Sequence, residues 1–178
     1  MEDIRDYNQL KMLKAFADTQ MSSTDMLGTT GYGLWDTGRA KLEQIFAEVM
    51  GAEDALVRSQ FQSGTHTLAV ALFGLLRAGD TLLAATGRPY DTLEGVIGLD
   101  GKGKGTGTLM DYGIRYDEAP LKDDFTPDYE LIAQKAPGAK VCHIQRSRGY
   151  LQRNAFDLET IRKIADTCLL YTSPSPRD

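Results

Sequence analysis

The 178-residue sequence has few cysteines, no long apolar run and no excess of basic residues. Its two cysteines, Cys142 and Cys168, are too few for a disulfide scaffold, and neither lies in a pattern with metal-ligand spacing. No apolar run reaches the ~20 residues of a membrane helix, so we expect no membrane partner. The formal net charge of -5 argues against sequence-independent nucleic-acid binding, in which Lys and Arg neutralise phosphates.

The composition is that of a soluble globular protein, with 42% hydrophobic and 25% charged residues. The start, MEDIRDYNQLKMLKAF, is charged throughout and is unlike a secretion signal. A cytoplasmic location is therefore the expectation.

The end of the sequence, CLLYTSPSPRD at residues 168–178, departs from the helical pattern that precedes it. It resembles, codon by codon, the translation of a transposon-end adapter used in preparing sequencing libraries. A natural disordered Ser/Pro tail is the alternative. We interpret residues 168–178 as non-native, which predicts that the natural sequence before them is the front part of a longer reading frame.

Hydrophobic periodicity predicts an alternation of helices and strands. The expected helices cover residues 4–16, 38–49, 65–76, 90–97, 127–134 and 157–166, and the expected strands cover residues 55–57, 81–85, 113–117 and 139–145. Asp157 is expected to be the N-cap or a first-turn residue of the last helix. Strands separated by helices of this length predict an α/β fold with a mostly parallel sheet.

A glycine-rich stretch, GLDGKGKGTGT, follows the fourth expected helix. It lacks the Gly-Lys-Ser/Thr ending of a phosphate loop, and its glycines do not have GxGxxG spacing. We interpret it as a flexible surface loop. The missing GxGxxG after the first strand also disfavours an NAD-binding domain.

The stretch Ser63-Gly64-Thr65-His66-Thr67 begins an apolar helix. The first turn of a helix carries unpaired N–H groups and partial positive charge, so it attracts anions. Small residues allow a phosphate to approach the backbone, and the hydroxyl groups add donors. The alternatives are that Ser63 only caps the helix and that His66 makes a local hydrogen bond instead of contacting a ligand.

Two further segments carry candidate binding residues. Arg88-Pro89-Tyr90 follows the strand TLLAA, at the carboxyl end where α/β sheets bind ligands, and Tyr90 is placed to stack on a flat ring. The alternative is that Tyr90 packs on the sheet edge. The segment from Gly31 to Arg39 is predicted to be an arm that presents Tyr32 and Arg39 to an anion in a partner subunit. A surface ion pair of Arg39 with Asp36 or Glu43 is the alternative.

Taken together, residues 4–166 resemble the pyridoxal-phosphate enzymes of cysteine and methionine metabolism. The similarity is to the branch called aluminium-resistance or methionine gamma-lyase-like proteins. The matching stretches are TTGYGLWDTGRAKLEQIFAEVMGAEDALVRSQFQSGTHTLAVALFGLLRAGD, TGRPYDTLEGVIG and HIQRSRGY.

The resemblance implies an aspartate-aminotransferase-type fold (fold type I), with helices on both faces of the sheet. It implies an N-terminal helix and arm over residues 1–40 and an incomplete cofactor-binding domain over residues 41–167. The expected cofactor is pyridoxal 5'-phosphate and the substrate a small amino acid. Ser63, Gly64 and Thr65 would hold the cofactor phosphate, and Tyr90 would stack on the ring and assist proton transfer. Tyr32 and Arg39 would reach the neighbouring subunit's phosphate in a homodimer or homotetramer.

In such enzymes a Schiff-base lysine and an acidic partner of the pyridine nitrogen follow the part of the sequence that corresponds to residues 4–166. No lysine of this sequence has the expected context, and Gln145 and Arg146 are expected only to face cofactor or substrate. We therefore expect an inactive, incompletely folded part of a carbon-sulfur lyase. The alternative is a non-catalytic module that binds a phosphorylated ligand at residues 63–67.

Overall fold

Two helices account for most of the first part of the chain in the computed structural model, which describes residues 2–29, 36–101 and 105–169. They are α1 (Glu2–Asp18) and α2 (Thr37–Met50), and the short 3-10 helix η1 (Ser23–Met26) lies between them. Both long helices were expected from the sequence and are confirmed. The chain divides into two units, Met1–Phe61 and Gln62–Asp178. The expected division near residue 40 stays a prediction.

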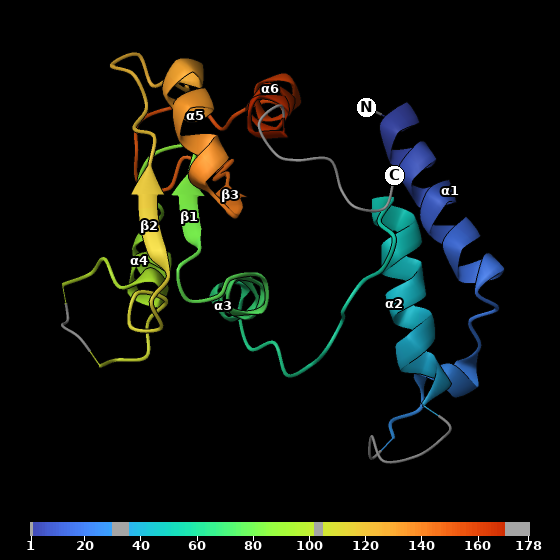
Figure 1. Cartoon of the computed structure of the whole chain (residues 1–178). Coiled ribbons are helices and arrows are strands. Elements are labelled where there is room, and N and C mark those ends of the chain that lie inside the picture. The colour runs from blue at the N-terminus through green and yellow to red at the C-terminus, as the bar shows by residue number, and fades with distance from the viewer. Residues whose placement is uncertain (1, 30–35, 102–104, 170–178) are drawn as a thin grey trace. The chain divides into compact units, whose positions relative to one another are not determined.

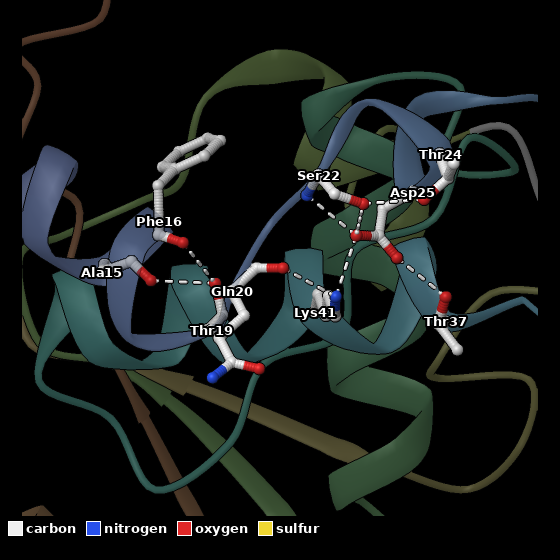
Figure 2. A network of polar contacts seen from close by, with 9 residues as sticks. All are labelled: Ala15, Phe16, Thr19, Gln20, Ser22, Thr24, Asp25, Thr37 and Lys41. Atoms are coloured by element: carbon white, nitrogen blue, oxygen red, sulfur yellow. Dashed lines mark hydrogen bonds and ion pairs between the residues drawn. The ribbon is translucent and has the colours of Figure 1, made fainter.

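A carboxylate that is only 4% exposed joins η1 to the start of α2. Asp25 accepts hydrogen bonds from the backbone N–H and hydroxyl of Ser22, from the hydroxyl of Thr37 and from Lys41 Nζ, all at 2.8–2.9 Å (Figure 2). These bonds, with the one from Lys41 first, hold the pKa of Asp25 well below its usual range. Gly38 is needed beside this cluster, because a Cβ there would lie 2.0 Å from the Asp25 carbonyl oxygen.

The second unit is built on a three-stranded parallel sheet with the order β2-β1-β3 (Figure 1). The strands are β1 (Thr81–Ala84), β2 (Arg115–Glu118) and β3 (Val141–His143). Leu82 of the central strand pairs with Tyr116 on one side and Val141 on the other. Parallel neighbours need crossover connections, and here helices supply them. The expected α/β arrangement with parallel pairing is thus confirmed.

Helices cover both faces of this sheet (Figure 1). Leu82 packs in a core with α3 (Gly64–Leu75) and α4 (Asp91–Ile97). The next residue, Leu83, packs in a second core with α5 (Tyr129–Lys135) and α6 (Leu158–Leu169), and the 3-10 helix η2 (Ala136–Gly138) extends α5. Successive side chains of a strand point to opposite faces, which is why β1 is apolar at consecutive positions.

The four helices of this unit were expected, and Asp157 is the predicted cap of α6, since its carboxylate accepts from Thr160 N at 2.8 Å. The helix α6 continues through Leu169, past the predicted junction after Thr167, and Cys168 is 6% exposed. The proposed adapter origin of residues 168–178 stays a prediction, and residues 170–178 lie outside the described residues.

The strand expected at residues 55–57 is wrong. This short apolar run contains no strand because no segment among the described residues pairs with its backbone. The Val57 N–H instead donates to the Glu43 carboxylate at 3.0 Å, and Arg58 forms an ion pair with the same carboxylate. A strand needs a partner ladder, and three apolar residues do not provide one.

The described end of the glycine-rich stretch wraps around a carboxylate of the chain itself. The backbone N–H groups of residues 105–108 all donate to Asp111, at 3.0–3.1 Å. These hydrogen bonds, with those from Gly105 and Thr108 largest, lower the pKa of Asp111 to about 2. Donors that bind Asp111 are not available to a phosphate, which agrees with the choice of a surface loop over a phosphate loop.

Candidate functional site

The start of α3 combines a capped turn with unpaired backbone donors. Ser63 Oγ accepts from His66 N at 3.1 Å, and the Ser63 carbonyl accepts from Thr67 N at 3.0 Å. Among the residues that the structure describes, no acceptor bonds the backbone N–H of Gly64 or Thr65. A Cβ at Gly64 would meet no atom of the chain within 4 Å. Ser63 therefore is a cap, and the turn that it caps also leaves two donors toward open space.

His66 makes the local contact that was the alternative to ligand binding. Its Nδ1 accepts from the backbone N–H of Gln62 at 3.2 Å.

The second predicted segment lies directly against this helix start. The hydroxyl groups of Thr65 and Tyr90 are 3.2 Å apart, and Thr65 Oγ1 is also 3.1 Å from Thr92 Oγ1. Tyr90 precedes α4 and its half-buried ring packs against the core of the α3 and α4 face. Two candidate groups separated by 25 positions in the sequence are thus neighbours in space.

Gln145 fixes the backbone of Tyr90. Gln145 Oε1 accepts from Tyr90 N at 2.9 Å, and Gln145 N donates to the hydroxyl of Thr86 at 2.9 Å. Thr86 follows β1 and is 3% exposed, while Gln145 follows β3. The side chains at the carboxyl ends of two adjacent strands therefore hold the start of α4, where ligands bind in open α/β sheets.

A cleft of about 660 Å³ lies at this edge of the sheet. It is lined by residues that follow β1, β2 and β3, among them Tyr90, Gln145 and Arg148. Arg88 also lines it, but its guanidinium is committed to both oxygens of Glu94, at 2.6 and 3.0 Å.

Other ionisable side chains at this part of the sheet are partly buried or already hydrogen-bonded. Glu118 lines the cleft and accepts from Tyr116 Oη at 2.5 Å, and burial, with this bond, raises the pKa of Tyr116. Burial lowers the pKa of His143, and its Nδ1 has no hydrogen-bond partner within the described part of the chain. His143 is therefore a neutral imidazole at neutral pH.

Two of the remaining predicted residues, Arg146 and Arg39, make contacts within their own units. Arg146 Nε donates to the Phe156 carbonyl at 3.1 Å, within the loop that follows β3. Arg39 Nη2 lies 2.9 Å from Asp36 Oδ2, which is the ion pair considered as the alternative to an arm contact. Tyr32 lies outside the described residues.

Several lysines make contacts with other side chains. Lys14, Lys41 and Lys135 form ion pairs with aspartates, and Lys163 lies over the ring of Tyr129. Lys122 and Asp123 both line the cleft. Lys102 and Lys104 lie outside the described residues. The described part of the chain contains no cluster of three His, Cys, Asp or Glu placed to hold a metal ion, and none of its helices is long and apolar enough to cross a membrane.

Arg153 is the residue of this region that the sequence analysis missed. It is 7% exposed, and its guanidinium donates to the carbonyl groups of Gln145, Ser147 and Asn154 at 2.7–3.2 Å. A single arginine in a loop is normally a surface residue, so the sequence contains no signal for this burial.

The family model for methionine gamma-lyase matches residues 1–170. The chain belongs to the methionine gamma-lyase family. Within that family it is similar to the uncharacterized protein YnbB of Bacillus subtilis (strain 168), with 43% identity over 165 residues, which are 92% of this chain and 39% of that protein.

Solved structures of this family are also similar to the chain. A carbon-sulfur lyase involved in aluminum resistance from Clostridium novyi matches 96% of this chain and 40% of its own, with 40% identity and a TM-score of 0.88. A protein from Clostridium acetobutylicum, with the provisional name of a cystathionine beta-lyase involved in aluminum resistance, has 37% identity and a TM-score of 0.90. It matches 96% of this chain and 41% of its own. The chain thus spans about two fifths of the length of these relatives.

Proposed function

We propose that this chain supplies the phosphate-binding and ring-binding part of a carbon-sulfur lyase that depends on pyridoxal 5'-phosphate. The observation that carries the proposal is the 3.2 Å contact between Thr65 Oγ1 and Tyr90 Oη. It joins a helix start that attracts anions to an aromatic side chain at the carboxyl end of a parallel sheet. Membership of the methionine gamma-lyase family and the lyase names of the relatives support the same assignment.

The residues present fit a phosphorylated aromatic cofactor. The backbone N–H groups of Gly64 and Thr65 are unpaired within the described residues, and the hydroxyl protons of Ser63 and Thr65 add donors of the kind that a phosphate accepts. A Cβ at Gly64 would meet no atom of the chain within 4 Å, so the space in front of the turn is open to a ligand. Tyr90 would then stack on the cofactor ring.

When bound, pyridoxal phosphate withdraws electrons from the substrate Cα and thereby permits removal of the α-proton and elimination of a sulfur leaving group. The residues of this chain bind and orient. Ser63, Gly64 and Thr65 would hold the phosphate, Tyr90 would hold the ring and assist proton transfer, and Gln145, which accepts from Tyr90 N, would keep Tyr90 in position.

We further propose that the whole protein is a homodimer or homotetramer acting on a small amino acid, with Tyr32 and Arg39 reaching the phosphate of a neighbouring subunit. Among the described lysines, Lys122 lines the cleft, and Lys14, Lys41 and Lys135 form ion pairs. The family resemblance gives none of them the role of the Schiff-base lysine, so we propose that the 178-residue chain binds pyridoxal phosphate without turning over substrate.

The test is a titration of the full 178-residue chain with pyridoxal 5'-phosphate, and with pyridoxal as the control that lacks phosphate. We expect pyridoxal phosphate to bind more tightly, and Ser63→Ala to weaken it while leaving pyridoxal unchanged. In a longer protein that includes the lyase's remaining sequence, we expect a visible absorbance band that borohydride reduction abolishes. Equal, weak binding of both compounds would refute the cofactor assignment. Binding of sugar phosphates alone would favour a non-catalytic module.

A further inference from the structure

A buried cation organises the loop between β3 and α6. The guanidinium of Arg153 donates to the carbonyl oxygens of Ser147 at 2.7 Å, Asn154 at 2.8 Å and Gln145 at 3.2 Å. Its carbon Cζ lies 4.0 Å from the centre of the Phe156 ring. No carboxylate pairs with Arg153 in the part of the chain that the structure describes, and burial lowers its pKa. Arginine nevertheless stays protonated in proteins, so the fold buries a charge without a counter-ion.

Burying a charge in this way is costly unless many hydrogen bonds compensate. Every acceptor of Arg153 belongs to the segment from Gln145 to Asn154, so its effect is concentrated on one loop. The three carbonyl oxygens converge on the guanidinium, and without a cation they would repel one another and turn toward water. The position of Gln145, the first residue of this segment, therefore depends on Arg153.

Hydrogen bonds continue from this loop to the candidate site. Arg153 Nη2 donates to the Gln145 carbonyl, Gln145 Oε1 accepts from Tyr90 N at 2.9 Å, and Tyr90 Oη meets Thr65 Oγ1 at 3.2 Å. The same Gln145 is held from the other side by Thr86. Gln145 is thus fixed at both its backbone N–H and its carbonyl, which leaves its side-chain oxygen aimed at Tyr90.

We propose that Arg153 is a positioning residue that acts through Gln145 to fix Tyr90 against the start of α3. The hydrogen-bonded path itself is independent of any ligand. Its consequence for the cofactor ring rests on the proposed function, because only there does Tyr90 meet a ligand.

Hydrogen exchange of the Tyr90 amide in the full chain measures the positioning directly. Arg153→Met keeps most of the side-chain volume and removes the donors, whereas Arg153→Lys keeps the charge but not the planar set of donors. We expect Arg153→Met to speed Tyr90 exchange by about two- to tenfold, the factor that corresponds to one net hydrogen bond, and Arg153→Lys to speed it less. The amide of Ile132, which bonds to Asp128 within α5, is the reference for general opening.

The matched control is Arg162→Met on α6, since Arg162 is exposed and makes no hydrogen bond or ion pair with described residues. It should leave Tyr90 exchange unchanged. Equal acceleration at Tyr90 and Ile132 in Arg153→Met would mean general loss of the fold and would overturn the proposal. Unchanged hydrogen exchange of the Tyr90 amide in Arg153→Met would also overturn the proposal.

Variants of Gln145 test the path and do not depend on the stability of the Arg153 variants. Gln145→Leu removes the acceptor of Tyr90 N and should speed its exchange, while Gln145→Glu retains an acceptor oxygen and should restore protection. If Arg153 acts through Gln145, adding Arg153→Met to Gln145→Leu should speed Tyr90 exchange no further. Independent, additive effects of the two changes contradict the path.

Titration with pyridoxal 5'-phosphate separates this inference from the proposed function. Weaker binding to Arg153→Met but not to Arg162→Met supports both. If the unmodified chain fails to bind pyridoxal phosphate while Tyr90 exchange still depends on Arg153, the positioning stands and the proposed function fails. If the chain binds pyridoxal phosphate and Arg153→Met changes neither affinity nor exchange, the positioning is overturned and the proposed function stands.

Discussion

The contact between Thr65 and Tyr90 predicts a measurable energetic coupling between the two side chains. Thr65→Val replaces the hydroxyl with a methyl group of similar size, and Tyr90→Phe keeps the ring while removing Oη. Thr65 Oγ1 meets Tyr90 Oη at 3.2 Å and Thr92 Oγ1 at 3.1 Å. Thr65→Val therefore removes two hydrogen bonds, and Tyr90→Phe removes one of them.

The distances set the size of the expected effect. Hydroxyl-to-hydroxyl hydrogen bonds are most often 2.7–2.8 Å, so both contacts of Thr65 are long. We therefore expect each of these hydrogen bonds to contribute a net free energy of about 0.5 kcal/mol to stability, at the lower end of the usual range for hydrogen bonds. We expect Tyr90→Phe to lower the free energy of unfolding by about 0.5 kcal/mol and Thr65→Val by about 1 kcal/mol. The double variant should lose about 1 kcal/mol and not the sum of the two single losses.

Urea unfolding of the four proteins at one pH measures this cycle, and Tyr112→Phe is the matched control. Tyr112 is 62% exposed and packs edge-on against Phe73, and its hydroxyl makes no hydrogen bond to the described residues. The stability lost in Tyr112→Phe should add to the stability lost in Thr65→Val. If the losses from Thr65→Val and Tyr90→Phe also add to within about 0.3 kcal/mol, the two hydroxyls do not interact and the argument for a joined site fails.

Three further predictions concern the stability of the two units. Leu83→Ala, at a residue that is 0% exposed in the core with α5 and α6, should lower the free energy of unfolding by about 2–5 kcal/mol in urea titrations, whereas Leu75→Ala, at a 58% exposed residue, should change it by less than about 0.5 kcal/mol. The pKa of Asp111 is lowered from 3.8 to about 2 in the folded state. The Asp111 carboxylate therefore stabilises the fold above pH 3.8, and this stabilisation is lost as the pH falls through about 2. Asp111→Ala should accordingly move the urea midpoint more at pH 7 than at pH 2. The pKa of Asp25 is lowered in the same direction, and Asp25→Asn should likewise remove part of the acid dependence of unfolding.

Local patterns were sufficient to predict the elements that bury a continuous apolar face. The run TLLAA is apolar at consecutive positions because β1 is central and packs on both faces, with Leu82 in one core and Leu83 in the other. The run at residues 55–57 has the same apolar character and is not a strand. The difference is the presence of pairing neighbours, which a short local pattern does not encode.

The candidate site was predictable only in its separate parts. Ser63 and Tyr90 stood out because each follows a turn and begins a helix, and parallel strands bring such loops to one edge of a sheet. The contact of Tyr90 with Gln145 joins residues 55 positions apart, and the role of Arg153 depends on a loop path. Neither leaves a period or a motif in the sequence, because long-range polar contacts are set by the tertiary fold.

The described residues include two groups of backbone N–H donors that suit an anion, and their different hydrogen bonding indicates where a phosphate binds. In the loop at residues 105–108 the N–H groups already bond to Asp111, so a phosphate would have to displace a carboxylate that is three to six positions away in the same chain. At the start of α3 the capping hydroxyl of Ser63 bonds to His66 N, and no described group of the chain bonds to the N–H of Gly64 or Thr65. Unpaired donors bind an anion without first breaking a bond, so α3 is the better phosphate site. Asp111→Ala should accordingly create a second, weaker site for inorganic phosphate in the loop, and Asp124→Ala should not.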